Sequence, residues 1–429
     1  MNNHLHEPGP LSLRTVQRAL AADQISPPEL LERCLARMPE AQRSGAFVTI
    51  DENGARKAAA ALDPRRRGAL YGIPCAVKDL VDVDGLPTAA GRTSGPVARE
   101  DAPIVSMLRA AGAIIVGKTR TDELGLATFT PGTHDPHDPG RSIGGSSGGS
   151  AIAVALGAAV LAVATDTAGS ARIPAAACGV AGLCASAGGL PGGGTVQLSA
   201  RFDRLGLIAA DGADLALAWR QLTGSSHVPT PTEIYTLAPG SLGRVDAERL
   251  AAADAAAHAL GAKVTELAGP PLPLFGAPRA IVITADAAAR HCVADAESPI
   301  VRRQLETGRA HTAEDVAAAQ QRLDELGGQL RAGIGSGVLV LPTLAGVPPR
   351  WDEITEIDDQ SRALGRLTRL CAPFNSSGLV AVSVPWSTDA AGHPIGVQVA
   401  AASEALALSA AAALRTASQP RQSGFPRTG

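Results

Sequence analysis

Residues 142–183 read SIGGSSGGSAIAVALGAAVLAVATDTAGSARIPAAACGVAGL, and this stretch decides the fold. A glycine and serine turn at 144–150 precedes an uninterrupted apolar run at 151–164, and a second glycine-containing turn at 165–172 follows it. The run has 14 residues, well short of the roughly 20 that span a bilayer. We therefore expect one buried helix or strand between two tight turns.

Short apolar runs alternate with helical patterns on both sides of this stretch. Strands are predicted at 73–77, 113–116, 280–284, 338–341, 379–384 and 395–399, and a loop at 186–195. Helices are predicted at 12–22, 27–38 after Ser26 as N-cap, 102–111 before Gly112, and 312–331. Strands that alternate with helices and come from both halves of the chain predict an α/β fold around a sheet.

The length and composition favour one large domain. The chain has 429 residues, of which 45% are hydrophobic, and neither a repeat nor a charged linker divides it. We predict a single domain over 1–429. It would contain a helical N-terminal segment (1–70), a core (71–210), a helix-rich region (211–335), and C-terminal strands and helices (336–429) that return to the core.

The charge balance excludes two kinds of partner. The 38 basic and 41 acidic residues leave a net charge of −3, so we expect neither nucleic acid nor a membrane surface as a partner. The six cysteines have no paired spacing, and the N-terminus does not read as a secretory signal. These features predict a cytoplasmic protein.

Lysine is rare, and one lysine stands out. Only Lys57, Lys78, Lys118 and Lys263 are lysines among the 38 basic residues. Lys78 ends an apolar strand, where burial would favour the neutral amine that a general base requires. The neighbouring Asp79 should point to the opposite face of the strand. The other three lysines are interpreted as ordinary surface or strand-end residues.

The two turns offer hydroxyl groups on a backbone that can approach a ligand closely. The segment GGSSGGS at 144–150 is compatible with a linker or an anion site, but it lacks the lysine of a phosphate-binding loop. Ser170 follows small residues whose N–H groups can converge as an oxyanion hole. No histidine lies between His137 and His227, so a lysine is the natural base for this serine.

Together these motifs resemble the amidase signature family of serine amidohydrolases. The matching stretches are GIPCAVKDLVDVDGLPTAAG (72–91), RAAGAIIVGKTRTDELG (109–125), the stretch at 142–183, and GHPIGVQVAA (392–401). The resemblance implies a single large domain with a central mixed β-sheet covered by α-helices. It also implies a Ser-cis-Ser-Lys triad that needs no cofactor or metal.

The resemblance assigns a role to each residue of the triad. Ser170 corresponds to the nucleophile, Ser146 to the bridging serine after a cis peptide bond from Gly145, and Lys78 to the proton acceptor. Ser147 is the alternative bridge. The N–H groups of Thr167, Ala168, Gly169 and Ser170 correspond to the oxyanion hole. Asp166 and Arg172 would order the turn, with a surface ion pair as the alternative.

Some positions depart from the family pattern. Ala177 and Cys184 stand where phenylalanine and lysine are usual, Ala168 replaces a glycine, and the glycine-rich stretch at 188–194 makes one pocket wall atypical. Cys178 is interpreted as a buried structural thiol. His134 and His137 have no further ligand to complete a metal site.

These features predict an amidohydrolase that converts a small amide to an acid plus ammonia or an amine. The alternatives are a catalytic subunit of a heteromeric amidotransferase or amidohydrolase complex, and a non-catalytic scaffold derived from the fold. A homodimer or a small partner subunit is compatible with the sequence, which leaves the substrate open.

Overall fold

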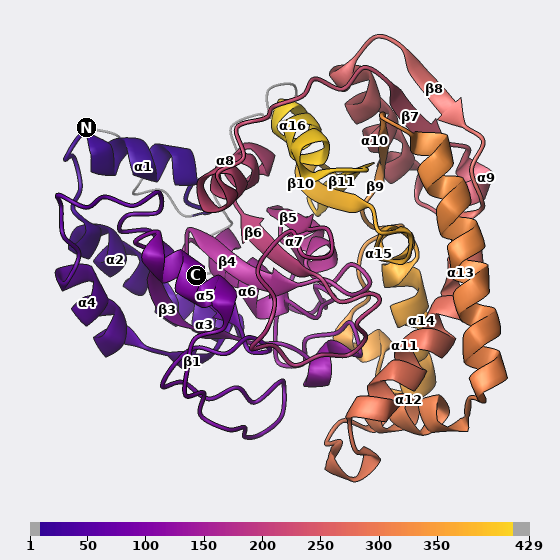
Figure 1. The fold of residues 1–429 in the computed structure, drawn as a ribbon, viewed down its shortest axis with the longest axis horizontal. Helices are drawn as coiled ribbons and strands as arrows, with labels where there is room; N and C mark the ends of the chain where they lie inside the picture. Colours follow the sequence, from indigo (N-terminus) through magenta and orange to yellow (C-terminus); the bar gives the residue numbers. More distant parts are fainter. Residues whose placement is uncertain (1–8, 415–429) are drawn as a thin grey trace.

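An 11-stranded sheet runs through the computed structural model, which describes residues 9–414 (Figure 1). Its strand order is β1-β3-β2-β4-β6-β5-β10-β11-β9-β7-β8. The strands are β1 Phe47–Ile50, β2 Pro74–Lys78, β3 Ile114–Thr119, β4 Leu161–Thr165, β5 Ala181–Cys184, β6 Leu205–Ala209, β7 Ile234–Leu237, β8 Val264–Leu267, β9 Val338–Pro342, β10 Val380–Thr388 and β11 Pro394–Ala401.

The sheet is mixed. β2 lies parallel to both β3 and β4, whereas the pairs from β4 through β6, β5, β10 and β11 to β9 are antiparallel. The parallel register places Lys78 opposite Thr119, so β2 and β3 end at the same edge of the sheet. This architecture confirms the predicted single α/β domain with a mixed sheet.

Helices cover both faces of the sheet. They are α1 Leu13–Ala21, α2 Pro27–Leu35, α3 Met38–Arg43, α4 Glu52–Ala60, α5 Pro103–Ala110, α6 Gly148–Ala155, α7 Arg172–Ala177, α8 Gly212–Thr223, α9 Pro239–Leu242, α10 Ala247–Leu260, α11 Gly276–Arg290, α12 Pro299–Ala310, α13 Ala313–Ile334, α14 Ile357–Thr368, α15 Ala372–Ser377 and α16 Glu404–Leu414. Short 3-10 turns lie at Glu123–Gly125, Leu272–Phe275, Val293–Asp295 and Trp351–Glu353.

Strand alternation divides the core between the two faces. Cys75 and Val77 of β2 belong to the core cluster on the face that carries α1, α5, α8, α10 and α16, whereas Ala76 belongs to the cluster that includes α4, α6 and α7. Further along the sheet, residues of β9, β10 and β11 form a core cluster with residues of α11, α13 and α15. Because Lys78 lies two residues after Ala76, its side chain points toward the face that carries α6 and α7.

Two predicted elements were wrong. The apolar run at 151–164 contains two elements, because α6 ends near Gly157, whose φ of +68° stops the helix, and β4 follows. Residues 280–284 lie inside α11 and form no strand. This helix buries Arg279, Val282, Ile283 and Ala287 at helical spacing, a pattern that a five-residue window cannot distinguish from a buried strand.

The other predicted strands and helices are confirmed, with ends shifted by a few residues; the pattern at 27–38 covers α2 and the start of α3. By length and composition, one helical segment of the described chain, Leu272–Arg290, passes a test for membrane spanning. Leu272, Phe275 and Val282 of this segment lie in the core, and core helices pass the same test.

Candidate active site

Lys78 lies fully buried at the end of β2, among hydroxyl groups. Its Nζ donates hydrogen bonds to Ser146 Oγ at 2.5 Å and to Thr165 Oγ1 at 2.7 Å. Burial lowers the pKa of Lys78 to about 8, although the carboxylates of Asp122, Asp166 and Asp203 oppose that shift. A substantial fraction of this amine is therefore neutral near pH 8.

Asp79 points away from Lys78, as strand alternation predicts. Its carboxylate pairs with Lys118 Nζ at 2.9 Å, and both side chains are buried. Lys118 also donates to the Pro87 carbonyl and to Thr88 Oγ1. Lys118 is thus a strand-end residue, as one of the two interpretations had it, but it is not a surface residue, because the loop after β2 covers the end of β3.

Asp122 is a buried group near Lys78 that sequence reasoning missed. It follows β3, is 1% exposed, and its Oδ2 has no hydrogen-bond partner in residues 9–414. Burial raises the pKa of Asp122, and the charge of Lys78 opposes that rise. The residue lies in the quoted stretch at 109–125, but nothing local marks it as a neighbour of Lys78.

The two serines of the first turn face different partners. The Gly145–Ser146 peptide bond is cis, as the family resemblance implied, and Ser146 Oγ accepts the hydrogen bond from Lys78. Ser147 instead donates its hydroxyl to the Thr165 carbonyl and its N–H to the Ser170 carbonyl. The contact with Lys78 thus belongs to Ser146, and Ser147 joins the first turn to the second.

Glycines let this turn enter the core. A Cβ on Gly149 would lie 2.4 Å from the Arg120 backbone nitrogen, and one on Gly148 would lie 2.5 Å from Thr130 Oγ1. A polar linker would not pack so closely, so the linker interpretation of 144–150 was wrong.

Ser170 lies in the second turn, which the buried ion pair between Asp166 and Arg172 stabilises. The Asp166 carboxylate accepts the N–H groups of Gly169 (2.7 Å) and Ala171 (3.2 Å) and pairs with Arg172 at 3.0 Å. Burial raises the pKa of Asp166, but Arg172 and these hydrogen bonds outweigh it and lower the pKa to about 2. Because both side chains are 0% exposed, the alternative of a surface ion pair was wrong.

Three backbone N–H groups near Ser170 remain available. Within residues 9–414, the N–H groups of Thr167, Ala168 and Ser170 have no hydrogen-bond partner, whereas that of Gly169 is bonded to Asp166. Free N–H groups converging beside a serine can stabilise a developing oxyanion.

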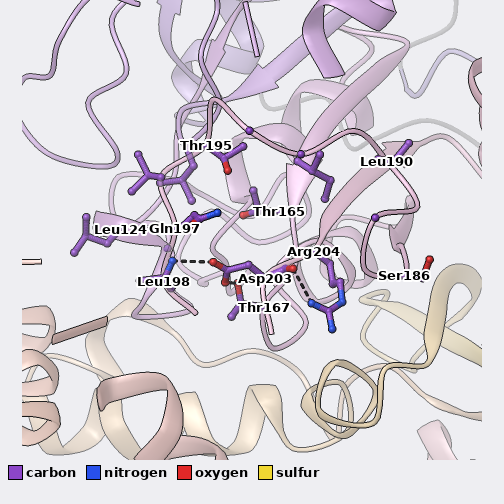
Figure 2. A pocket seen from close by; sticks show the side chains of 17 residues that line it. Leu124, Thr165, Thr167, Ser186, Leu190, Thr195, Gln197, Leu198, Asp203 and Arg204 are labelled. Atoms are coloured by element: carbon purple, nitrogen blue, oxygen red, sulfur yellow. Dashed lines mark hydrogen bonds between the residues drawn. The ribbon is translucent and has the colours of Figure 1, made fainter. Parts of the chain in front are cut away.

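Two cavities adjoin this turn and share Gly125 and Thr167. The first, of about 150 Å³, lies between Thr165, Thr167, Asp203 and the glycine-rich stretch at 188–193 (Figure 2). The second, of about 130 Å³, lies against Ser170 and is lined by Gly125, Leu126, Thr128, Thr167, Ala168, Ser170, Arg279, Ala280, Ile283, Thr284, Gln304 and Leu364. Ser170 therefore lines a cavity between the turn after β4 and helices α11 and α12.

The remaining sequence candidates lie behind the site or apart from it. Cys184 is buried, and its Sγ accepts a hydrogen bond from Asn375, which also bonds Arg172. Cys178 is a buried thiol whose pKa burial raises, as predicted. In the part of the chain that the structure describes, no group of three or more His, Cys, Asp or Glu side chains is arranged to hold a metal.

The fold and this site define a class: an α/β protein in which a buried lysine bonds a serine hydroxyl in one turn, and a second turn joined to it carries a serine beside free N–H groups. The chain belongs to the amidase family, whose model, described as Amidase, matches residues 29–244 and 279–405. The resemblance drawn from the motifs is thereby confirmed.

Individual relatives agree with this family. The chain is 36% identical over 345 residues to "Amidase" of Pseudomonas putida, covering 72% of this chain and 74% of that protein. It is 40% identical over 227 residues to a glutamyl-tRNA(Gln) amidotransferase subunit of Anaeromyxobacter sp. (strain K), covering 50% of this chain and 46% of that one, so it spans about half the length of that relative. A solved structure titled "Crystal structure of amidase" superposes with a TM-score of 0.85 at 30% identity, over 95% of this chain and all of that one.

Proposed function

We propose that the protein is an amidohydrolase that cleaves a carboxamide C–N bond through a serine acyl-enzyme, releasing an acid plus ammonia or an amine. One observation carries this proposal: the fully buried Lys78 contacts Ser146 Oγ at 2.5 Å, in a turn bonded to Ser170. A buried amine without a directly bonded carboxylate is suited to accept a proton.

In the proposed mechanism, neutral Lys78 takes a proton from Ser146 while Ser146 takes the proton of Ser170. Ser170 Oγ then forms a bond to the amide carbon, and the N–H groups of Thr167, Ala168 and Ser170 stabilise the oxyanion. Ser146 next donates its proton to the leaving nitrogen, Lys78 returns a proton to Ser146, and the C–N bond breaks. Water cleaves the ester by the same relay in reverse.

Asp166 and Arg172 have a supporting role in this mechanism. Asp166 accepts the N–H groups of Gly169 and Ala171, and Arg172 holds the Asp166 carboxylate in place, so the turn is ordered before substrate binds. The proposed substrate is a small-molecule amide, and the five buried cysteines fit the proposed cytoplasmic location.

A second candidate is a catalytic subunit that works within a complex. The observation that favours it is the 40% identity to a glutamyl-tRNA(Gln) amidotransferase subunit over half of this chain. Native mass spectrometry of the purified chain, alone and after co-purification with candidate partners, separates the two: a chain that is active alone, as a monomer or homodimer, fits the first proposal.

The test of the proposal is ammonia release from a panel of aliphatic, aryl, ureido and peptide amides. We expect Ser170→Ala to lower turnover by about 10³-fold or more, because the acyl-enzyme cannot form. Ser336→Ala, which changes an exposed serine on another part of the molecule, is the matched control and should keep full activity. Equal rates for the wild type and Ser170→Ala would refute the serine mechanism.

A further inference from the structure

Arg279 brings a guanidinium to the cavity beside Ser170. It is the fourth residue of α11, its side chain is 7% exposed, and it lines the same cavity as Ser170 and the free N–H groups of Thr167 and Ala168. Neither the proposed mechanism nor the motifs of the sequence give this residue a role.

Within residues 9–414, Arg279 is nearly unsatisfied. Its Nη2 donates a long hydrogen bond of 3.4 Å to Thr368 Oγ1, its Nε is buried without a partner, and it forms no ion pair with a carboxylate. Burial lowers the pKa of Arg279 to about 10, so the group stays charged at neutral pH. A buried charge that lacks a counter-ion is unfavourable for folding, and such groups are usually paired.

Arg172 shows how the same fold satisfies a guanidinium that serves structure alone. It is also buried, and it bonds the Asp166 carboxylate, the side-chain oxygens of Asn375 and Gln398, and the Cys371 carbonyl. The contrast indicates that the partner of Arg279 is not a part of the described chain.

The lining of the same cavity includes a second unsatisfied group. Gln304 of α12 lines the cavity, and its Oε1 is buried without a hydrogen-bond partner in the described residues. Ala280, Ile283 and Leu364 supply apolar surface to the same cavity. A cavity of about 130 Å³ with one cation and one acceptor suits a small anionic molecule.

We propose that Arg279 binds a carboxylate on the acyl part of the substrate, so that the enzyme hydrolyses short monoamides of dicarboxylic acids. This inference rests on the proposed amidohydrolase function. The reaction is −OOC–R–CONH₂ + H₂O → −OOC–R–COO⁻ + NH₄⁺, through an ester of Ser170. A guanidinium fits a carboxylate with two parallel hydrogen bonds, and Gln304 is placed to accept an N–H group from R.

The positions of the two cavities indicate that the acyl part of the substrate, and not the leaving amine, lies in the cavity lined by Arg279. Ala168 and Ser170, whose N–H groups are proposed to receive the carbonyl oxygen, line the cavity of Arg279 and not the other one, whereas Thr165, which bonds Lys78, lines only the other cavity. The leaving nitrogen must meet the proton of Ser146 on the side of Lys78, so the acyl chain extends toward α11.

The test compares anionic amides with neutral amides of the same shape. The probes are malonamate against 3-methylbutanamide and succinamate against 4-methylpentanamide, in which an isopropyl group replaces the carboxylate. One of the two anions, malonamate or succinamate, should be the better substrate. We expect the wild-type kcat/KM for that anion to exceed the value for its neutral counterpart by at least about 10-fold. Arg279→Met should lower kcat/KM for that anion by about 100-fold and change the neutral amides less than about threefold.

Two variants control for charge and folding. Arg279→Lys should restore part of the preference, because it keeps the cation without the planar fork. Arg290→Met alters an exposed arginine of the same helix and should change nothing. A wild type without preference for either anion, or an Arg279→Met variant that slows both classes equally, overturns this inference and leaves the amidohydrolase proposal standing.

A binding measurement separates this inference from the proposed function. Titration of Ser170→Ala with succinate and with malonate by calorimetry needs no turnover. If a dicarboxylate binds and Arg279→Met abolishes that binding, the anion site is supported. This holds even if no amide in the panel is cleaved, a result that would refute the proposed amidohydrolase function. Absence of binding for both dicarboxylates overturns the site.

Discussion

Lys78 and Lys118 end neighbouring parallel strands, yet their surroundings differ in one decisive respect. Both are 0% exposed, and the strand register sets them one residue apart, with Val77 opposite Lys118. Lys118 directly contacts the carboxylate of Asp79, whereas the hydrogen bonds of Lys78 Nζ within residues 9–414 go only to the hydroxyls of Ser146 and Thr165. Lys118 is therefore a cation in an ion pair, whereas Lys78 is an amine that can give up its proton.

The difference shows how one fold can hold a charged group that stabilises the structure and, close by, an ionisable group that takes part in proton transfer. Burial lowers the pKa of both lysines, but at Lys118 the bonded Asp79 is the main opposing group. Around Lys78 the carboxylates of Asp122, Asp166 and Asp203 act through space and do not bond its Nζ. Arg172 and Arg279 repeat the contrast, since the first has a carboxylate and the second has none in residues 9–414.

The largest expected effect is that of Lys78→Arg on turnover. We expect kcat to fall by about 10³-fold or more, because a guanidinium keeps its proton and cannot serve as a base. Ammonia release on the best amide of the panel measures this loss. Lys57→Arg, at an exposed position of α4, is the control and should retain full activity. Substantial turnover by Lys78→Arg would contradict the role of the lysine.

Lys118→Met should act on stability instead. Removing the cation leaves Asp79 buried without its counter-ion, which costs about 3–5 kcal/mol of unfolding free energy. Urea unfolding measures the change, and Lys263→Met, at an exposed position, should change it by less than about 0.5 kcal/mol. An unaltered midpoint for Lys118→Met would show that this ion pair is not needed for the fold.

The smallest effect concerns pH. Because neutral Lys78 is the proposed base and its pKa is about 8, kcat/KM should rise with pH through about 8. The charge of Asp122 raises the pKa of Lys78, so Asp122→Asn should lower that pKa and move the rise to lower pH by about one unit.

A pH profile of kcat/KM from pH 6 to 10 tests this shift. Asp254→Asn, on the exposed side of α10, is the control and should leave the profile in place. A rise that stays at the wild-type pH in Asp122→Asn, or moves to higher pH, contradicts the coupling between Asp122 and Lys78.

Much of the fold was predictable because its signals are local. The runs at 73–77 and 113–116 became β2 and β3, and the helix at 312–331 became α13, since strand and helix periods are visible within one element. The error at 280–284 arose because a short apolar run is compatible with both periods. The error at 151–164 arose because Gly157 ends a helix without breaking the apolar composition.

The residues of the candidate site also fall into those with a local sequence signal and those without one. The turns that carry Ser146 and Ser170 were recognised because each needs glycine and small residues within a few positions. Asp122, Arg279 and Gln304 were missed because burial and the absence of a partner depend on segments far away in the sequence. Their residue types alone give no sign of either property.

The sequence by itself therefore determined the α/β class, the family and the residues of the proposed triad, because these depend on periodicity and on short motifs. The tertiary structure decided which buried cations meet a carboxylate. In the described part of the chain, Lys118 pairs with Asp79 across two neighbouring strands, Lys78 hydrogen-bonds two hydroxyl groups and no carboxylate, and Arg279 lines a cavity. The physical reason is that the energy of a buried charge depends on what packs against it, and this is set only when distant segments come together.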